Sequence, residues 1–445
     1  MATAALRHST GFGCDSGTKM NEATKVKHWL VCAGWGVLVL AASAATAGAQ
    51  QFALKDGDAV VFYGDSITAQ RLYTRDVEDF VLTRYPQMNV RFVNAGVPGD
   101  TVRGGYAGTM SERVRRDVEP FRPTMVTVML GMNDGGWGQA SPEIDAAFQN
   151  GFRTALDELR KAAPGALITL ISPTPYDEIT HGTEFPGYSR VIDRFAEDVT
   201  GIGDQLRASG DKKVLVANFN RPITHALELA KAESPELAPL IVPDRIHPAA
   251  TGHWIMAAAL MYAWHIDPIV SSLKLNAATG QVIDKERTAV TNLERLPDGL
   301  KWTQRDDALP LPLDFNDAMT PMLLRISDIA DLDQMILRVE SLDSGKYQLS
   351  IDGKETASFS REELQHGVNL ALFKTPMLNQ ARDIDSQESE RMMLDQARFI
   401  LSADLNQGAG SSAAQDRLRQ AQDELAASIR KDLDPKPHQF ELRRK

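Results

Sequence analysis

The sequence predicts a doubly wound α/β domain over residues 50–267, followed by a smaller β-rich region. Three observations support this prediction. Short apolar, β-branched runs bounded by turns recur along the first half of the chain, as is typical of buried parallel strands. Amphipathic stretches of helical length separate these runs. After Pro268, long helical patterns give way to short alternating ones.

Strands and helices alternate regularly within the first domain. The runs of strand length are 59–64, 90–96, 125–131, 166–172 and 213–219. The stretches of helical length are 75–86, 109–119, 142–163, 187–208, 222–233 and 250–266. Repeated strand–helix units pair their strands in parallel and cover the sheet with helices. We therefore expect a mostly parallel sheet of about five strands.

The rest of the chain divides into an accessory region, 268–382, and a polar helical tail, 383–445. Residues 268–320 are rich in proline and poorly patterned, whereas 321–360 alternate. An Asp-Gly pair at Asp352 separates two alternating runs, which is a strong hairpin signal and predicts an antiparallel meander. In the tail we expect a linker over 408–415, a charged helix over 416–432 and a disordered last dozen residues.

The N-terminus has the pattern of an export signal. Two lysines precede an apolar run over 29–40, and an Ala-Gly-Ala cleavage motif ends at Ala49. We expect residues 1–49 to be removed and the protein to be periplasmic or extracellular. Met20 offers an alternative start. An uncleaved membrane anchor is the competing interpretation, but the run is short, which favours cleavage without stable membrane insertion.

Charge and cysteine content narrow the classes of partner. The formal net charge is −11, and it becomes −13 without residues 1–49, which carry four basic and two acidic side chains. Such an acidic chain argues against nucleic acid as a partner. Both cysteines, Cys14 and Cys32, precede the cleavage site. The mature chain is therefore expected to have no disulfide and no thiolate metal site.

Chemically competent residues follow the predicted strands. Ser66, Gly99 and Asn133 follow the first three strands, and Asp244 and His247 share a later loop. The carboxyl ends of parallel strands meet at one edge of a sheet, so we expect these residues to lie together. Serine, histidine and aspartate are the nucleophile, base and orienting group of acyl transfer. Backbone amides of Ser66 and Gly99, with the Asn133 side chain, form a candidate oxyanion hole.

Each of these residues also has an ordinary structural interpretation. Asn133 is a suitable helix N-cap, and Gly99 suits a plain turn. His247 is equally compatible with a loop position, and Asp244 with capping the turn that follows it. Taken singly these explanations are the better ones. Taken together, the order in which these residues follow successive strands favours a catalytic site.

Four sequence blocks resemble those of the SGNH or GDSL hydrolase superfamily. The blocks are "GDSI" (64–67), "GVPGDT" (96–101), "GMND" (131–134) and "DRIH" (244–247). The resemblance covers about 52–267 and extends weakly to C-terminal extensions of some bacterial members. It implies a flavodoxin-like three-layer α/β/α sandwich and an esterase that needs neither a metal nor an organic cofactor. The family roles fall on Ser66, Gly99, Asn133, Asp244 and His247.

Other site types fit less well. The sequence does not match the G-x-S-x-G nucleophile motif of α/β-hydrolases, because Thr68 stands where that motif has its second glycine. A dinucleotide-binding G-x-G-x-x-G is absent from the glycine-rich loop. A metal site at His247 and His253 would need an acidic neighbour on the same face, and the sequence has no H-E-x-x-H motif, so His253 is expected to be structural.

The substrate prediction rests on weaker signals. Trp137 lies in "GGWGQ" just after Asn133 and is a candidate for stacking on a sugar ring, with core packing as the alternative. No long apolar lid is evident, which favours short acyl groups. Export and the β-rich region favour acetyl esters of carbohydrate or glycan. The alternatives are a non-catalytic glycan-binding protein, an O-acyltransferase and a lysophospholipase-type acylhydrolase.

Overall fold

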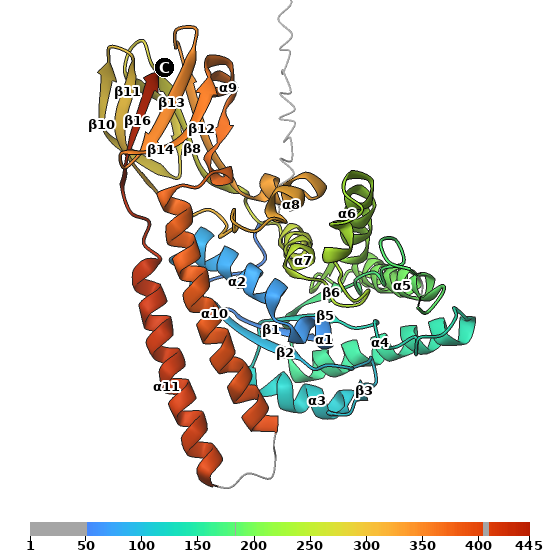
Figure 1. The fold of residues 1–445 in the computed structure, drawn as a ribbon. Coiled ribbons are helices and arrows are strands. Elements are labelled where there is room, and N and C mark those ends of the chain that lie inside the picture. The colour runs from blue at the N-terminus through green and yellow to red at the C-terminus, as the bar shows by residue number, and fades with distance from the viewer. Residues whose placement is uncertain (1–50, 183, 404–408) are drawn as a thin grey trace, which may run out of the picture. The chain divides into compact units, whose positions relative to one another are not determined.

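The computed structural model describes residues 51–182, 184–403 and 409–445 (Figure 1). The predicted signal region 1–49, with Met20, both cysteines and the cleavage site at Ala49, lies outside the described residues. Within the described ranges, no helix combines the length and the apolar character needed to cross a membrane.

A five-stranded parallel sheet forms the centre of the first half of the chain. Its strand order is β2-β1-β5-β6-β7, and every neighbouring pair is parallel. The strands are β1 (Ala59–Gly64), β2 (Arg91–Gly96), β5 (Met125–Met129), β6 (Leu167–Ile171) and β7 (Val214–Ala217). This order is that of flavodoxin-like sheets, in which sites lie at the carboxyl edge where the strand order reverses. The predicted fold class is confirmed.

Helices cover both faces of this sheet. They are α2 (Leu72–Arg84), α3 (Met110–Asp117), α4 (Pro142–Ala162), α5 (Tyr188–Ala208), α6 (Asn220–Glu233) and α7 (Ala250–Ala263). Helices α2 and α6 contact α7 on one face, whereas α3 and α5 contact α4 on the other (Figure 1). Side chains from both layers meet the sheet in one hydrophobic core.

The described residues also contain several short elements. They are α1 (Ser66–Ala69), β3 (Gly104–Gly105), β4 (Gly108–Thr109), α8 (Thr320–Ile326), α9 (Arg361–His366) and the 3₁₀ turns Glu119–Phe121, Ala238–Leu240, Ile329–Leu332 and Leu370–Leu372. Strands β3 and β4 pair as a small antiparallel hairpin.

Two further sheets occupy the C-terminal half. Their strand orders are β10-β11-β16-β13-β14 and β15-β12-β8-β9. The strands are β8 (Ile269–Asn276), β9 (Gln281–Glu286), β10 (Thr288–Leu296), β11 (Gly299–Asp306), β12 (Gln334–Glu340), β13 (Lys346–Ile351), β14 (Lys354–Ser360), β15 (Val368–Asn369) and β16 (His438–Arg444). The hairpin between β13 and β14 is confirmed, with Asp352 at φ 52° and Gly353 at φ 76°.

The structure corrects four sequence-based expectations in this half. Residues 268–320, predicted to be poorly patterned, contain strands β8 to β11. The run at 323–328, predicted as part of a meander, lies mostly in helix α8. Strand β12 pairs in parallel with β8 rather than with β13. The last residues, predicted to be disordered, form β16 between β11 and β13.

The predicted tail is a pair of long helices. They are α10 (Pro376–Ala403), which begins before the predicted boundary at 383, and α11 (Ala409–Asp432), which takes in most of the predicted linker. Gln50–Lys445 forms one compact unit with two hydrophobic cores. Buried residues between Leu311 and Leu332 belong to the core of the parallel sheet, although 268–382 was predicted as one region.

Helix α10 packs along α2 through buried charged groups. The Arg391 guanidinium forms an ion pair with Glu78, and Arg75 Nε lies 3.2 Å from Asp385 Oδ1. Burial raises the pKa of Glu78 to about 8. Burial, and then the nearby carboxyl groups of Asp385 and Glu388, raise the pKa of Asp79 well above its ordinary range.

The raised pKa values of Glu78 and Asp79 predict that the free energy of unfolding falls as pH rises. A carboxyl group whose pKa is raised by folding contributes stability that is complete below the unfolded pKa, near 4, and is lost as pH rises through the folded pKa. The variant Asp79→Asn has no charge at this position. We expect its melting temperature to fall less than that of the wild type between about pH 5 and pH 8. Circular dichroism at several pH values measures this difference.

The matched control is Asp157→Asn, since Asp157 is exposed on α4. This control is expected to follow the wild-type curve. An Asp79→Asn curve that also parallels the wild type would show that Asp79 is not a source of the pH dependence.

Candidate active site

Ser66 lies at the carboxyl edge of the parallel sheet, directly after β1. Asp65 caps the short helix α1 by accepting the Ile67 amide at 3.0 Å, which makes Ser66 its first residue. Gly64 permits this sharp turn. A Cβ at Gly64 would lie 2.2 Å from the Thr68 hydroxyl oxygen and 2.9 Å from the Met129 carbonyl oxygen. Only glycine allows the strand to end so close to its neighbour.

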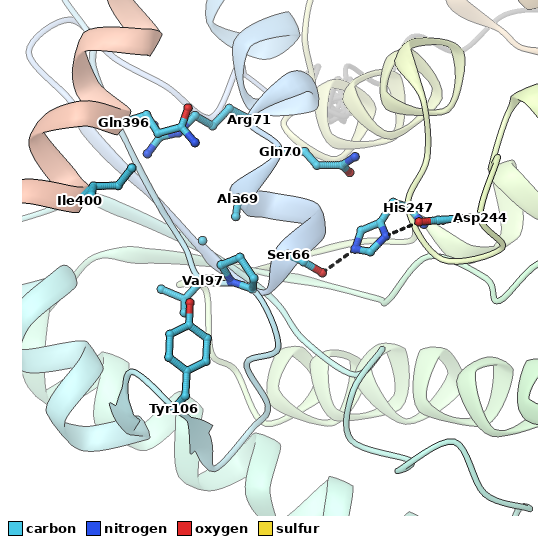
Figure 2. A pocket seen from close by; sticks show the side chains of 12 residues that line it. Ser66, Ala69, Gln70, Arg71, Val97, Tyr106, Asp244, His247, Gln396 and Ile400 are labelled. Carbon is cyan, nitrogen blue, oxygen red and sulfur yellow. Dashed lines mark hydrogen bonds and ion pairs between the residues drawn. The ribbon is translucent and has the colours of Figure 1, made fainter. Parts of the chain in front are cut away.

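Ser66, His247 and Asp244 form a continuous hydrogen-bonded chain (Figure 2). His247 Nε2 lies 2.8 Å from Ser66 Oγ, and His247 Nδ1 lies 2.8 Å from Asp244 Oδ2. Since an ionised carboxylate only accepts, Nδ1 carries the proton and Nε2 is free to accept from the serine. The structure thus brings together the three residues predicted as the triad.

A tight local turn holds the aspartate. Asp244 Oδ1 accepts the backbone amides of Ile246 at 3.0 Å and His247 at 2.7 Å. Burial opposes ionisation of Asp244, but these amides and the His247 ring lower its pKa below the ordinary range. Asp244 is therefore ionised at neutral pH and suited to stabilise a histidine that has gained a proton.

The two remaining predicted residues lie on the loops that follow the neighbouring strands. In register, Gly64 is paired with Gly96 on one side and with Met129 on the other, so these loops leave the sheet level with Ser66. Gly99 has φ 75°, a conformation that favours glycine. The Asn133 side-chain amide donates to the carbonyl of Asp100 at 2.9 Å and thereby links both loops. One amide hydrogen of Asn133 remains for another acceptor.

The helix-cap interpretation of Asn133 is wrong. Helix α4 begins at Pro142, and its cap is Ser141, whose hydroxyl accepts the Ile144 amide at 3.3 Å. Asn133 is followed by a series of turns rather than by a helix. Its side chain is therefore engaged by the loop that carries Gly99.

A buried network that was missed from the sequence supports the Gly99 loop. Arg113 of α3 is fully buried and donates to the carboxylates of Asp100 and Asp117 and to the carbonyl of Ala95. The Tyr63 hydroxyl also donates to Asp100, at 3.3 Å. The sequence signal that could have revealed this network is Arg113 itself, a charged residue on the face of α3 that packs against the core.

Comparison with known proteins identifies the family. Residues 62–255 match the GDSL-like lipase/acylhydrolase family, and this range includes Ser66, Gly99, Asn133, Asp244 and His247. Over these residues the chain belongs to that family. It is therefore a GDSL-family acylhydrolase, that is, an esterase.

Two proteins similar to this chain differ in how much of it they cover. An acetylxylan esterase of Geobacillus stearothermophilus is 26% identical over 227 residues, which are 46% of this chain and 93% of that protein. A solved structure described as a gut microbial diltiazem-metabolizing enzyme has a TM-score of 0.73 at 23% identity and covers 88% of this chain and 98% of its own. This likeness shows that the fold, including the C-terminal half, occurs in another protein.

A cavity of about 610 Å³ opens beside the serine of the GDSL domain (Figure 2). Its lining includes Ser66, His247, Gln70, Arg71, Tyr106 and, from helix α10, Gln396 and Ile400. The contribution of α10 was missed from the sequence, because no local pattern reveals that the tail returns to the site. Neither Gly99 nor Asn133 is among the lining residues.

Trp137 lies apart from this cavity. Its ring packs in an aromatic cluster, with centroid distances of 6.4 Å to Tyr176, 5.4 Å to Phe185 and 4.9 Å to Tyr188. Trp137 therefore packs against other aromatic side chains, as the alternative interpretation of this residue expected. Its role in binding sugar stays a prediction.

His253 of the GDSL domain is a buried structural residue. Its Nδ1 accepts the Tyr73 amide at 3.1 Å, so its Nε2 carries the proton and donates to Gln70 Oε1 at 3.0 Å. Burial lowers the pKa of His253 to about 3, which keeps the ring neutral. Across the described part of the chain, no cluster of three or more acidic, histidine or cysteine side chains has the arrangement of a metal site.

Proposed function

We propose that this protein is a serine esterase that hydrolyses short-chain acyl esters, principally acetyl esters of carbohydrate, through Ser66, His247 and Asp244. The observation that carries the proposal is the hydrogen-bonded chain from Ser66 Oγ through His247 to Asp244 at one side of an open cavity. The name of the Geobacillus relative supports acetyl esters of a plant polysaccharide as the substrate class.

The geometry supports a two-step reaction. Ser66 Oγ attacks the ester carbonyl carbon while His247 Nε2 takes its proton. The resulting oxyanion accepts hydrogen bonds from the backbone amides of Ser66 and Gly99 and from the Asn133 side chain. The bond to the alcohol oxygen then breaks, and His247 protonates the departing alcohol. Water, activated by the same histidine, releases the acid from Ser66.

We further propose that the protein is exported. The support is the apolar run over 29–40 followed by the cleavage motif at Ala49. Export suits a substrate that lies outside the cytoplasm, such as an acetylated glycan.

Hydrolysis of 4-nitrophenyl esters of increasing chain length tests the esterase proposal. We expect kcat/KM to be highest for the acetate and to fall through the butanoate to the octanoate. Brief exposure to the acetate, followed by acid quenching and mass spectrometry, is expected to show one acetyl group on the peptide that contains Ser66. His247→Ala should remove both signals, since no base then activates the serine.

Acetate release from acetylated xylan and other acetylated glycans then identifies the alcohol. A rate that increased with acyl chain length would contradict the short-chain proposal and favour a lipase. Acetyl transfer to an added alcohol, in preference to water, would instead show an acyltransferase.

A further inference from the structure

Arg71 is a buried cation in the wall of the cavity beside Ser66. It lies between α1 and α2 in a left-handed backbone conformation with φ 68°, and only 7% of the residue is exposed. Its side chain lines the cavity (Figure 2), and its buried Nε has no hydrogen-bond partner. Its guanidinium forms no hydrogen bond or ion pair with any residue that the structure describes.

The acidic groups near Arg71 are engaged elsewhere. Glu78 and Asp395 act on Arg71 electrostatically. Glu78, however, pairs directly with Arg391. Asp395 accepts from the Gln422 amide and lies 3.5 Å from Arg391 Nη1. An arginine remains charged when buried, and a buried charge without a direct partner is costly. Arg71 is therefore suited to a negatively charged group that arrives from the cavity.

The other polar side chains of the cavity also supply donors. The oxygen of the Gln70 side chain is occupied by His253, which leaves its amide hydrogens for another acceptor. Gln396 faces the same cavity from α10. Among the described lining residues Asp244 is the one carboxylate, and it is bound by His247 and by backbone amides. This set of donors favours a ligand rich in acceptor oxygens.

Apolar side chains form the rest of the wall. Tyr106, at the tip of the β3–β4 hairpin, is 80% exposed, and Ile400 of α10 is 59% exposed. Both line the cavity together with Val97 and Pro98. The volume, about 610 Å³, far exceeds that of an acetyl group and falls in the range of sites that bind ring-sized ligands. Exposed apolar side chains at such a site are suited to cover a ring.

We propose that this cavity receives the alcohol part of the ester and that Arg71 binds a carboxylate on that part. The substrates are thus acyl esters of ring-containing alcohols that carry a negative charge. This inference rests on the proposed function, because it places the ester beside Ser66 as the nucleophile. It adds that charge on the leaving alcohol, as well as the acyl group, determines which esters react.

Three aryl acetates that differ in charge test the inference: 4-acetoxybenzoate, phenyl acetate and 4-acetoxyphenyltrimethylammonium. Each kcat/KM is divided by the rate of hydroxide-catalysed hydrolysis, which removes the difference in leaving-group reactivity. We expect the wild type to prefer the anionic ester over the neutral one, and the neutral over the cationic. In Arg71→Gln the anionic-to-cationic ratio should fall by about tenfold to a hundredfold, as expected for loss of a hydrogen bond between charged groups.

Two further variants complete the design. Arg71→Lys keeps the charge and should retain part of the preference. Arg221→Gln removes an exposed charge on α6 that does not line the cavity, and should leave the ratio at the wild-type value. Because each ratio is measured within one protein sample, a reduced amount of folded variant does not affect it.

The outcomes separate this inference from the proposed function. Hydrolysis of all three esters with acetyl-Ser66 formed, but with the same ratio in the wild type and Arg71→Gln, would overturn the inference and leave the esterase proposal intact. A lower melting temperature with an unchanged ratio would assign Arg71 to balancing Glu78 and Asp395 instead. Absence of hydrolysis and of acetyl-Ser66 would overturn both.

Discussion

Ser66→Ala is expected to lower kcat for ester hydrolysis by roughly a million-fold while the fold is retained. The substitution removes the hydroxyl oxygen that lies 2.8 Å from His247 Nε2. Ser66 is partly exposed at the carboxyl edge of the sheet. Loss of its hydroxyl removes one hydrogen bond, to a histidine whose side chain is 31% exposed, and is therefore expected to cost little stability. The capping contact of Asp65 to the Ile67 amide also remains.

Initial rates with 4-nitrophenyl acetate and a thermal melt measure this expectation. Ser344→Ala is the matched control, because Ser344 is an exposed serine in the turn between β12 and β13. It should behave as the wild type in both measurements. If purified, folded Ser66→Ala hydrolysed the ester at a near-wild-type rate, Ser66 would not be the nucleophile.

Asn133→Ala is expected to lower kcat by roughly a hundred- to a thousand-fold, as for removal of one oxyanion donor. It also removes the hydrogen bond from the Asn133 amide to the carbonyl of Asp100. That loss should destabilise the protein by about 1 kcal/mol and lower its melting temperature slightly. kcat at saturating substrate and the melting temperature together separate the two effects.

Asn133→Asp sharpens the test. Aspartate has nearly the shape of asparagine but has no amide donor, and it places a negative charge where negative charge forms during the reaction. We expect kcat to fall at least as far as in Asn133→Ala. Near-normal kcat in Asn133→Asp would withdraw Asn133 from the oxyanion hole and leave it only the task of joining the Gly99 loop to its neighbour.

Much of the α/β domain was predictable because its signals are local. A parallel strand covered by helices on both faces must be apolar along its whole length, as β1 is. A residue that directly follows such a strand lies at the carboxyl edge of the sheet whatever the loop does next. The positions of Ser66 and Asn133 were therefore predictable from their places after β1 and β5. Each of them also follows a glycine by two positions, Gly64 or Gly131, and glycine at the end of a strand is typical of a turn.

The C-terminal half was less predictable because its contacts are distant in sequence. Strand β16 alternates over only a few positions, with His438, Phe440 and Leu442 buried. It becomes a strand because β11 and β13 supply partners on both sides. The run in α8 alternates weakly, yet it folds as a helix, since residues around it pack into the core of the parallel sheet. Tertiary packing outweighs such short local preferences.

The sequence alone determined the parallel sheet, the triad residues and the family, since each depends on residues close together in the chain or on recognisable blocks. Only the tertiary structure decided what surrounds the serine. Helix α10 packs on α2 and brings Gln396 and Ile400 to the cavity. The same contact pairs Glu78 with Arg391, and among the described residues Arg71 then has no direct ion-pair partner. Burial and pairing of charges depend on what packs against them, and no local pattern encodes that.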